Sequence, residues 1–429
     1  MKVLIVHYRY FISGGPERYL FNVKEALENR GHSVIPFSIR TANNASSEYE
    51  SFFAPNIGDS NEVLLEKYPK TIRTIFDLIA REFYSFKIKK CLKILIEKTH
   101  PDICYLLAYK RALSPSVIDA CAEMSLPIVN RLSDYNMVCC AASLYRDGHF
   151  CDDCISSGDF QGVKYKCVKN SHIFSLMRYF SNHFFKLKRF DAKIQRYICT
   201  NEFMRLMMIK KGFSENKSSV LPTFFKESKI LKSLPKENLI DSKIKFLFIG
   251  NMDESKGVFD LLASVILLKK DVVNFHLTMV GGLRDYENTK VKNIIDNNEL
   301  TDFVTMEPFQ HSGNVFEYYL KNNLTIIPAR WVENLPNTLI ESLYFNRPVV
   351  VPDVGSFKYT VDDSVAFKFD ALSQKALAET LKYICQQPTS ILQKSLNCKA
   401  FFNARYTEEM HINGLLNIFD EQVELYENF

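Results

Sequence analysis

The sequence lacks any stretch long enough to cross a membrane as a helix. None of its apolar runs approaches the roughly 18 uninterrupted residues that such a span needs. Its first ten residues, MKVLIVHYRY, form a strand-like run without the apolar region and cleavage site of a signal peptide. An internal repeat of solenoid length is missing as well. We therefore expect an intracellular protein, cytoplasmic or bound at the inner face of the cell membrane.

The length and charge of the chain indicate two unlike halves. At 429 residues it is too long for one compact core, so we expect two domains of roughly 200 residues each. Residues 1–217 hold 32 Lys and Arg against 22 Asp and Glu, a net charge of +10. Residues 218–429 hold 22 against 27, a net charge of −5. The basic half predicts an anionic ligand or surface as its partner, and the alternative is an uneven but solvated charge distribution.

Short apolar β-rich runs alternate with helical patterns in both halves, which predicts two doubly wound α/β domains with parallel sheets. The predicted strands are 3–8, 33–38, 102–108, 127–133 and 192–200, then 245–250, 274–282, 303–309, 324–329 and 348–355. A linker is expected at 221–242, where periodicity is weak. The expected domains are 1–217 and 218–405, followed by a helical segment over 406–429.

Ligands of such folds bind beyond the carboxyl ends of the strands, so the residues after each strand are the candidates for a site. A single-domain oxidoreductase is disfavoured, because G-x-G-x-x-G does not follow the first strand. Gly14 and Gly15 follow that strand and precede a helix whose amides can receive an anion. Lys256 follows the strand ending in Gly250 and can neutralise a phosphate. The alternatives are an ordinary strand–helix loop and a solvated surface lysine.

Residues 330–342 read RWVENLPNTLIES and place two carboxylates around a predicted helix start. Pro336 suits the first turn of a helix running to about Phe345. That start would leave unpaired amide donors at Asn337, Thr338 and Leu339. Glu341 is also compatible with a capping box, whereas Glu333 has no such local role. Two carboxylates and a set of amides suit a sugar nucleotide, which offers hydroxyls, a ribose diol and a diphosphate.

These motifs resemble family 4 of the retaining glycosyltransferases, which have the GT-B fold, over essentially the whole chain. The residues that carry the resemblance are Gly14-Gly15-x-Glu17, RGHSV, Gly250, Glu254-Ser255-Lys256-Gly257, Glu333-x7-Glu341 and ESLYFNRPVVVPDVG. The resemblance implies two Rossmann-like domains facing an interdomain cleft. It implies a nucleotide-sugar donor in the C-terminal domain, an acceptor in the N-terminal domain, and a final helix that crosses back between them after Tyr406.

The resemblance also implies roles for individual residues. Glu333 would hold the donor sugar, Glu341 the ribose and Lys256 the diphosphate, while Gly15 would contact the donor phosphate or the acceptor. The chain departs from the family pattern at Asn251, where the family usually has Arg, and at Ser133-Asp134, where it often has His-Asp. We expect Arg330 to replace the missing cation, because a guanidinium can pair with phosphate in a bidentate manner. Asp134 remains a candidate catalytic residue.

The function that we expect is retaining hexosyl transfer from a UDP- or GDP-sugar to a glycan or lipid-linked acceptor, in bacterial surface polysaccharide biosynthesis. An obvious nucleophile is missing, which suits the family's front-face displacement without a catalytic divalent metal. Catalysis would come from positioning and from charge stabilisation on the leaving diphosphate. The alternatives are a nucleotide-sugar epimerase or phosphorylase on the same fold, and a catalytically impaired scaffold.

Five of the eleven cysteines cluster within residues 139–167. Cysteines in a reducing compartment are metal ligands more readily than disulfides. Four thiolates can close a structural zinc site, for which the candidates are Cys139, Cys151, Cys154 and Cys167. Cys140 and His149 are alternative ligands, although a Cys five residues after the strand-end Asp, as in some family members, favours Cys139. The remaining alternative is a set of reduced, unligated thiols.

Basic and aromatic residues are interleaved from Gly162 to Tyr197 and again over 83–98. The aromatic members of the first segment are Tyr165, Phe174, Tyr179, Phe180, Phe184, Phe185 and Phe190. Basic amphipathic helices of this kind fit an anionic membrane surface. The alternative is that the aromatic side chains face the core. A nucleic-acid partner is not expected, because no recognition motif is present.

Overall fold

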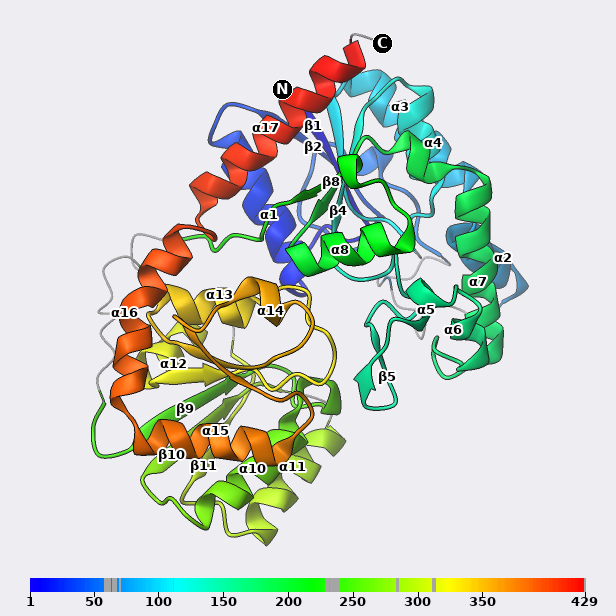
Figure 1. The fold of residues 1–429 in the computed structure, drawn as a ribbon. Coiled ribbons are helices and arrows are strands. Elements are labelled where there is room, and N and C mark those ends of the chain that lie inside the picture. Colours follow the sequence, from blue (N-terminus) through cyan, green and yellow to red (C-terminus); the bar gives the residue numbers. More distant parts are fainter. Residues whose placement is uncertain are drawn as a thin grey trace.

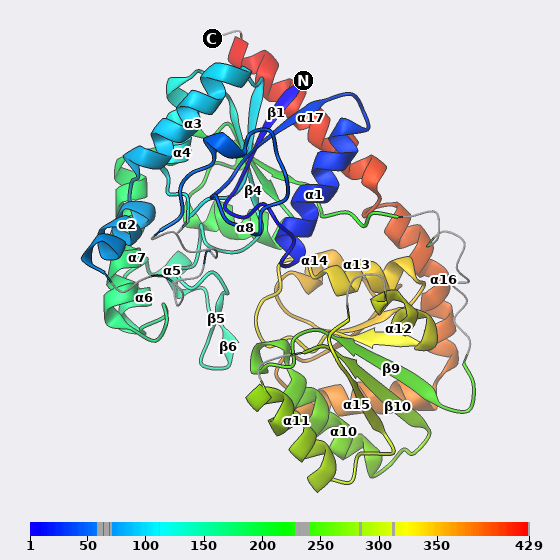
Figure 2. The same cartoon turned by 180° about the vertical axis from the view of Figure 1, so that it is seen from behind.

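The chain folds around two six-stranded, all-parallel sheets in this computed structural model, and helices cover the faces of both sheets (Figures 1 and 2). The structure describes residues 1–57, 63, 68, 71–110, 112–227, 231, 240–282, 285–310 and 314–427. The predicted fold class is therefore confirmed. Within these residues no helix is both long and apolar enough to span a membrane.

The first sheet has the strand order β2-β1-β3-β4-β7-β8. Its strands are β1 (Lys2–His7), β2 (Ser33–Phe37), β3 (Ile103–Ala108), β4 (Ile128–Leu132), β7 (Arg196–Cys199) and β8 (Ser218–Val220). Its helices are α1 (Gly15–Glu28), α2 (Ile72–Glu82), α3 (Phe86–Thr99), α4 (Ser116–Glu123), α7 (His172–Leu187) and α8 (Glu202–Lys211), with short 3-10 turns at Glu50–Phe52, Phe190–Lys193 and Glu215–Lys217. Between β4 and α7 lie a hairpin of β5 (Tyr145–Arg146) and β6 (His149–Phe150), then α5 (Asp153–Ser156) and α6 (Gln161–Lys164).

The second sheet has the strand order β11-β10-β9-β12-β13-β14. Its strands are β9 (Ile244–Ile249), β10 (Phe275–Val280), β11 (Val304–Glu307), β12 (Leu324–Ile326), β13 (Val349–Pro352) and β14 (Ala366–Phe369). Its helices are η5 (Glu254–Lys256), α10 (Val258–Lys269), α11 (Asp285–Asn297), α12 (Val315–Lys321), α13 (Asn337–Tyr344), α14 (Phe357–Thr360), α15 (Gln374–Gln386) and α16 (Thr389–Asn403). The strand order reverses between β9 and β12, and doubly wound folds bind ligands beyond such a reversal.

Local sequence accounts for the elements that were predicted. Each of the ten predicted strands is present, because buried β-branched and aromatic runs such as Val349–Val351 suit a sheet covered on both faces. Several helices begin where a side chain accepts a hydrogen bond from the first turn, among them those after Thr71, Ser85, Ser171, Asn201, Ser373 and Thr407. The short edge strands β8 and β14 were not predicted. Half of the expected linker, residues 228–230 and 232–239, lies outside the described residues.

The last helix, α17 (Glu408–Glu427), returns to the first sheet and packs along α1 (Figures 1 and 2). Its apolar residues Ile412, Leu415 and Phe419 are buried in the same core as Tyr19 and Tyr105. The chain after the second sheet therefore contributes part of the core of the first.

His411 fixes the start of α17 through two hydrogen bonds in a buried position. Its Nδ1 lies 2.6 Å from the carbonyl oxygen of Pro222, and its Nε2 lies 2.8 Å from the hydroxyl of Tyr19. A carbonyl can only accept, so Nδ1 carries the proton and Nε2 accepts from Tyr19. Burial, and then the nearby Arg131 guanidinium, lower the pKa of His411 to about 3. The neutral ring is therefore the form that the folded state requires.

A glycine is required where η5 meets α10. Gly257 has a φ of +75°, in the left-handed region that favours glycine. A Cβ at this position would overlap the carbonyl oxygen of Pro328, which follows β12. The close approach brings the loops after β9 and β12 together.

We predict that Gly257→Ala destabilises the protein by about 3 kcal/mol or more, because it adds a clash with a backbone carbonyl to the strain of a positive φ. Gly158→Ala is the matched control, with a φ of +96° and no atom of the described residues within 4 Å of the added Cβ. The control should lose about 1 kcal/mol. Urea denaturation followed by circular dichroism measures both, and equal losses would contradict the close approach.

We predict that His411 contributes stability that is lost on acidification. The pKa in the folded state is about 3, against 6.5 for an ordinary His, so the folded state binds fewer protons between these values. The contribution is complete above pH 6.5 and declines as the pH falls toward 3, by up to about 1.4 kcal/mol per pH unit. His411→Gln should flatten the pH dependence of the free energy of unfolding in this window. His149→Gln, in an exposed hairpin, should leave it unchanged, and equal slopes in all three proteins would contradict the assignment.

Candidate active site

The candidate site lies beyond the carboxyl ends of β9 and β12, where the strand order of the second sheet reverses. Lys256 comes from the η5 turn after β9, and Glu333 comes from the loop after β12. Strands β9 and β12 are paired directly, so the loops that follow them start side by side. The topology therefore places both predicted residues in one site.

Glu333 is the centre of a small charged cluster. Its Oε1 accepts a hydrogen bond of 2.6 Å from the Lys256 ammonium and one of 2.8 Å from the Trp331 indole. The ammonium also lies 4.7 Å from the centre of the Trp331 ring, in cation–π contact. Glu333 is only 7% exposed. A buried carboxylate is stable here because a cation and an indole N–H satisfy it.

The backbone of Glu333 is held from two sides. Its carbonyl oxygen accepts a hydrogen bond of 3.0 Å from the Tyr135 hydroxyl and one of 2.6 Å from the Ser356 hydroxyl. Tyr135 follows β4 of the first sheet, and Ser356 precedes α14 of the second. The loop that carries Glu333 therefore belongs to the seam between the two sheets.

The next residue, Asn334, strengthens that seam. Its side-chain oxygen accepts hydrogen bonds from Thr200, at 2.6 Å, and from Asn201, at 2.8 Å. Its side-chain amide donates to the carbonyl oxygen of Leu132 at 3.3 Å. These partners lie at the carboxyl ends of β4 and β7, so the binding edges of the two sheets face each other.

Glu341 is not a helix cap. Helix α13 begins after Pro336 without a side-chain cap, and Glu341 lies inside the helix. Its carboxylate accepts a hydrogen bond of 2.8 Å from the Tyr319 hydroxyl and lies 3.4 Å from the Arg18 guanidinium of α1. Burial raises the pKa of Glu341, and the Tyr319 hydrogen bond and the Arg18 charge oppose that rise. The capping-box alternative is therefore wrong, and Glu341 links the two halves of the chain.

The helix starts predicted to receive an anion lie against each other. A Cβ on Gly15, at the first residue of α1, would come within 2.9 Å of the Asn337 side-chain nitrogen at the first residue of α13. Gly14 is the N-cap of α1. The amide of Leu339 already donates to the Pro336 carbonyl oxygen at 3.1 Å, so it is not the unpaired donor that we expected. Thr338 stays a predicted donor beside Asn337.

The other predicted residues lie around this cluster with different partners. Arg330 pairs with Glu254 at 2.6 Å and with Asp260 at 2.7 Å, so two carboxylates already balance its charge. Asn251, after Gly250, is exposed. Asp134 is exposed beside Tyr135, and its carboxylate accepts a hydrogen bond of 2.8 Å from the amide of Asn136. The structure thus brings Lys256 and Glu333 together and holds Arg330 in a separate ion-pair group.

Sequence reasoning missed several residues of the site. The missed residues contact Glu333 or Glu341, and they are Trp331, Arg18, Tyr319 and Tyr135. Trp331 carried a signal, since it is the only tryptophan of the chain and lies two residues from Glu333. The others had none, because they reach the carboxylates from distant positions in the sequence.

The arrangement of the cysteine cluster does not support the predicted zinc site. The Sγ atoms of Cys140 and Cys154 lie 3.8 Å apart, and hydrogen bonds from both thiols lower the pKa of Cys139. Cys151 and Cys167 are half-buried. Throughout the described ranges, which include these five cysteines, no three His, Cys, Asp or Glu side chains are placed to hold one metal ion. The thiols form a hydrogen-bonded group that consists of Cys139, Cys140, Cys154 and Cys167, so the alternative ligand Cys140 belongs to it.

We predict that Glu333→Ala destabilises the protein by about 1–3 kcal/mol, because it leaves the Lys256 ammonium and the Trp331 N–H without their shared acceptor. Glu254→Ala is the control, since the Glu254 side chain is 69% exposed and also pairs with a cation. The control should change stability by no more than about 0.5 kcal/mol. Urea denaturation measures both, and a Glu333→Ala variant as stable as the wild type would contradict a buried, cation-bound carboxylate.

Comparison with known proteins agrees with this arrangement. Residues 231–400 match the family model described as glycosyl transferases group 1. An uncharacterized glycosyltransferase, MJ1059 of Methanocaldococcus jannaschii, is 29% identical over 146 residues, which is 32% of this chain and 34% of the relative. The match thus spans about a third of the length of that curated relative.

Two solved structures show the same fold across nearly the whole chain. A glycosyltransferase from Rickettsia africae aligns with a TM-score of 0.66 and 15% identity, covering 98% of both chains. Anabaena Alr3699/HepE, solved in complex with UDP, aligns with a TM-score of 0.64 and 12% identity, covering 98% of this chain and 100% of that one. Residues 231–400 are therefore similar to the group 1 glycosyl transferases, and the chain shares the two-sheet fold of these solved structures.

Proposed function

We propose that the protein transfers a hexose from a UDP- or GDP-sugar to a glycan or lipid-linked saccharide, with retention of the anomeric configuration. The observation that carries this proposal is the buried Glu333 carboxylate, which the Lys256 ammonium and the Trp331 indole hold at 2.6 and 2.8 Å. Its place at the reversal of strand order is where this type of fold binds nucleotides. HepE, which shares the fold, was solved with UDP. A role in bacterial surface polysaccharide biosynthesis is part of the proposal.

Donor binding exchanges partners within this cluster. Sugar hydroxyls donate to the Glu333 carboxylate, which has two acceptor oxygens, while the Lys256 ammonium turns to the diphosphate oxygens. The two groups are neutralised by each other before the donor arrives, so neither charge is left uncompensated. The ion pair therefore holds the Glu333 carboxylate and the Lys256 ammonium in position for the donor before it binds.

Glu341, the second carboxylate, also exchanges partners when the donor binds. Glu341 receives the ribose diol, and Tyr319 holds one of its oxygens in place. Arg18, which pairs with Glu341 at 3.4 Å and is partly exposed, is then free to meet the diphosphate from the side of the first sheet. Arg18 thus becomes the second cation of the site, in place of Arg330, whose charge Glu254 and Asp260 already balance.

In the transfer step, the bond between the anomeric carbon and the diphosphate oxygen breaks, and its electron pair leaves with the diphosphate. The acceptor hydroxyl forms the new glycosidic bond on the same face of the sugar. Its proton passes to an oxygen of the leaving diphosphate. Lys256 and Arg18 stabilise the charge that develops on that group, and the helix starts at Gly15 and Asn337 add their amides.

We predict that Lys256→Met lowers kcat for sugar transfer about 100- to 1000-fold, because it removes a preorganised cation from the leaving group. Glu333→Ala should lose activity to a similar degree. Lys321→Met is the control, a lysine whose side chain is 68% exposed and paired with Glu317, and it should retain wild-type kcat. Transfer of labelled sugar and release of nucleotide are measured in parallel.

Two results would contradict this proposal. One is transfer at near wild-type rates by Lys256→Met or Glu333→Ala. The other is donor conversion that needs no acceptor and yields an epimer, since that would assign the site to a nucleotide-sugar epimerase.

A further inference from the structure

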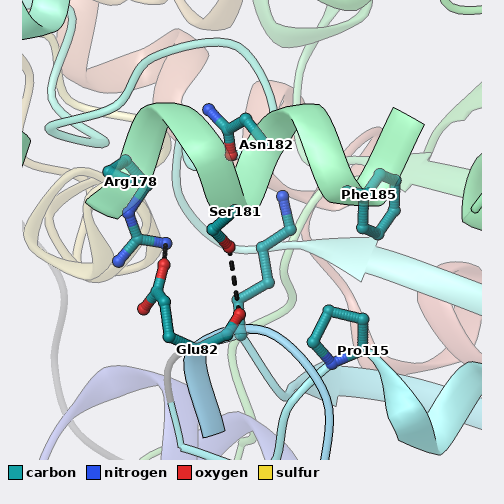
Figure 3. Close-up of a pocket in the computed structure, with 7 residues that line it drawn as sticks. Glu82, Pro115, Arg178, Ser181, Asn182 and Phe185 are labelled. Carbon is teal, nitrogen blue, oxygen red and sulfur yellow. Dashed lines mark hydrogen bonds and ion pairs between the residues drawn. The ribbon is translucent and has the colours of Figure 1, made fainter. Parts of the chain in front are cut away.

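Helices α2 and α7 lie side by side on the side of the first sheet opposite α17 (Figures 1 and 2). A buried ion pair joins them, with Arg178 of α7 3.0 Å from the Glu82 carboxylate of α2. The Ser181 hydroxyl of α7 also donates to the Glu82 carbonyl oxygen at 3.0 Å. Figure 3 shows Arg178 and Ser181 both pointing from α7 to Glu82. An ion pair and a hydrogen bond thus join the two helices.

Helix α2 exposes its apolar stripe and buries its polar one. Its exposed apolar residues are Ile72, Ile75, Phe76 and Ile79, with exposed fractions of 75, 57, 68 and 43%. The spacing i, i+3, i+4, i+7 places all four on one side of the helix. The buried residues of α2 are Thr74, Arg81 and Glu82. This is the reverse of an ordinary surface helix.

Helix α7 shows the same inversion. Ile173, Leu176, Phe180 and Leu187 share one side of the helix and are exposed by 78, 39, 52 and 78%. The residues buried on its other side include Ser175, Arg178 and Ser181. Eight large apolar side chains thus face outward from two adjacent helices. These exposed side chains, which we call the α2–α7 face, indicate an interaction surface.

Cations lie on or next to the same two helices, and they indicate the kind of partner. Exposed basic residues occur on α2, just before α7 and at the end of α7, at Arg73, Lys169, Lys186, Lys188 and Arg189. Among the acidic groups beside them, Asp77 is half-buried on α2, Asp159 pairs with Lys186 at 3.2 Å, and Asp191 is exposed after Arg189. The domain that carries the face has a net charge of +10 over residues 1–217. Bulky apolar side chains with cations on the same helices are complementary to an anionic lipid surface.

We propose that the α2–α7 face docks the protein on an anionic lipid bilayer. Both helices lie in the plane of the surface, with the isoleucine, leucine and phenylalanine side chains below the headgroups and the cations among them. The Glu82–Arg178 ion pair keeps the two stripes in register. The docking does not depend on the proposed transfer reaction, although it would bring the site to a lipid-linked acceptor.

This surface differs from the one that the sequence predicted. The expected face ran through the aromatic residues of 162–197, but Phe185 and Phe190 are buried in the core. Lys193, also expected there, pairs with Asp119. The apolar stripe of α2 was not predicted at all. The exposed surface thus consists mainly of isoleucine and leucine side chains on two helices, and Phe180 is its one member from the predicted aromatic residues.

The test is flotation of the full-length protein with phosphatidylcholine vesicles that contain or lack phosphatidylglycerol. Wild type should bind the anionic vesicles more strongly. High salt should weaken this binding, because the Debye length falls to about 3 Å at 1 M salt. Ile75→Ser with Phe76→Ser should weaken binding about tenfold or more, since two apolar side chains no longer leave water. Ile173→Ser with Phe180→Ser should act in the same way.

Leu396→Ser is the matched control, because Leu396 is 83% exposed but lies on α16 of the second domain. It should bind vesicles as the wild type does. Circular dichroism confirms that the variants are folded. No binding of wild type to anionic vesicles, or binding that the α2 and α7 substitutions leave unchanged, would overturn the proposal. Self-association that these substitutions abolish, without vesicle binding, would also overturn it and assign the face to a second copy of the chain.

Discussion

The ion pair of 2.6 Å between Lys256 and Glu333 is the contact on which the rest of the site depends. It joins the loops after β9 and β12, which are neighbours only because the strand order of the second sheet reverses between them. Gly257 allows these loops to approach, since a side chain there would overlap the Pro328 carbonyl oxygen. Trp331 completes the pair by donating to the same carboxylate oxygen and by covering the ammonium with its ring. Gly257, the strand order of the second sheet and the Trp331 indole thus determine where the two charges of this ion pair lie.

The same loop also holds the two sheets together. Tyr135 binds the Glu333 carbonyl oxygen, and Asn201 and Thr200 bind Asn334, so the first sheet contacts the backbone and side chains beside the candidate catalytic carboxylate. Arg18 reaches Glu341 from α1 in the same way. A ligand that changed the position of this loop would therefore change the seam. Binding at the site and the relative position of the sheets are physically linked.

The sequence predicted the sheets well because their strands are buried runs with strong β propensity. It predicted Glu333 and Lys256 because both follow strands, where this fold class binds ligands. It could not predict the partners of Glu341, since Tyr319 and Arg18 come from other elements and leave no local pattern. It could not decide between Cys139 and Cys140, because spacing shows which thiols can meet and does not show which of them lie in contact. It missed the face of α2 because periodicity reveals an apolar stripe without saying whether the stripe is buried.

The central claim is that the Lys256–Glu333–Trp331 cluster is the nucleotide-sugar site, and the single tryptophan of the chain allows a direct test. The intrinsic fluorescence of Trp331 is titrated with UDP, GDP and their sugars, in the wild type and in Lys256→Met. The account predicts a saturable change in emission with one of the two nucleotides, at concentrations that rise strongly when Lys256 is replaced. Nucleotide binding detected by calorimetry without any change in Trp331 emission would place the donor elsewhere and contradict the account.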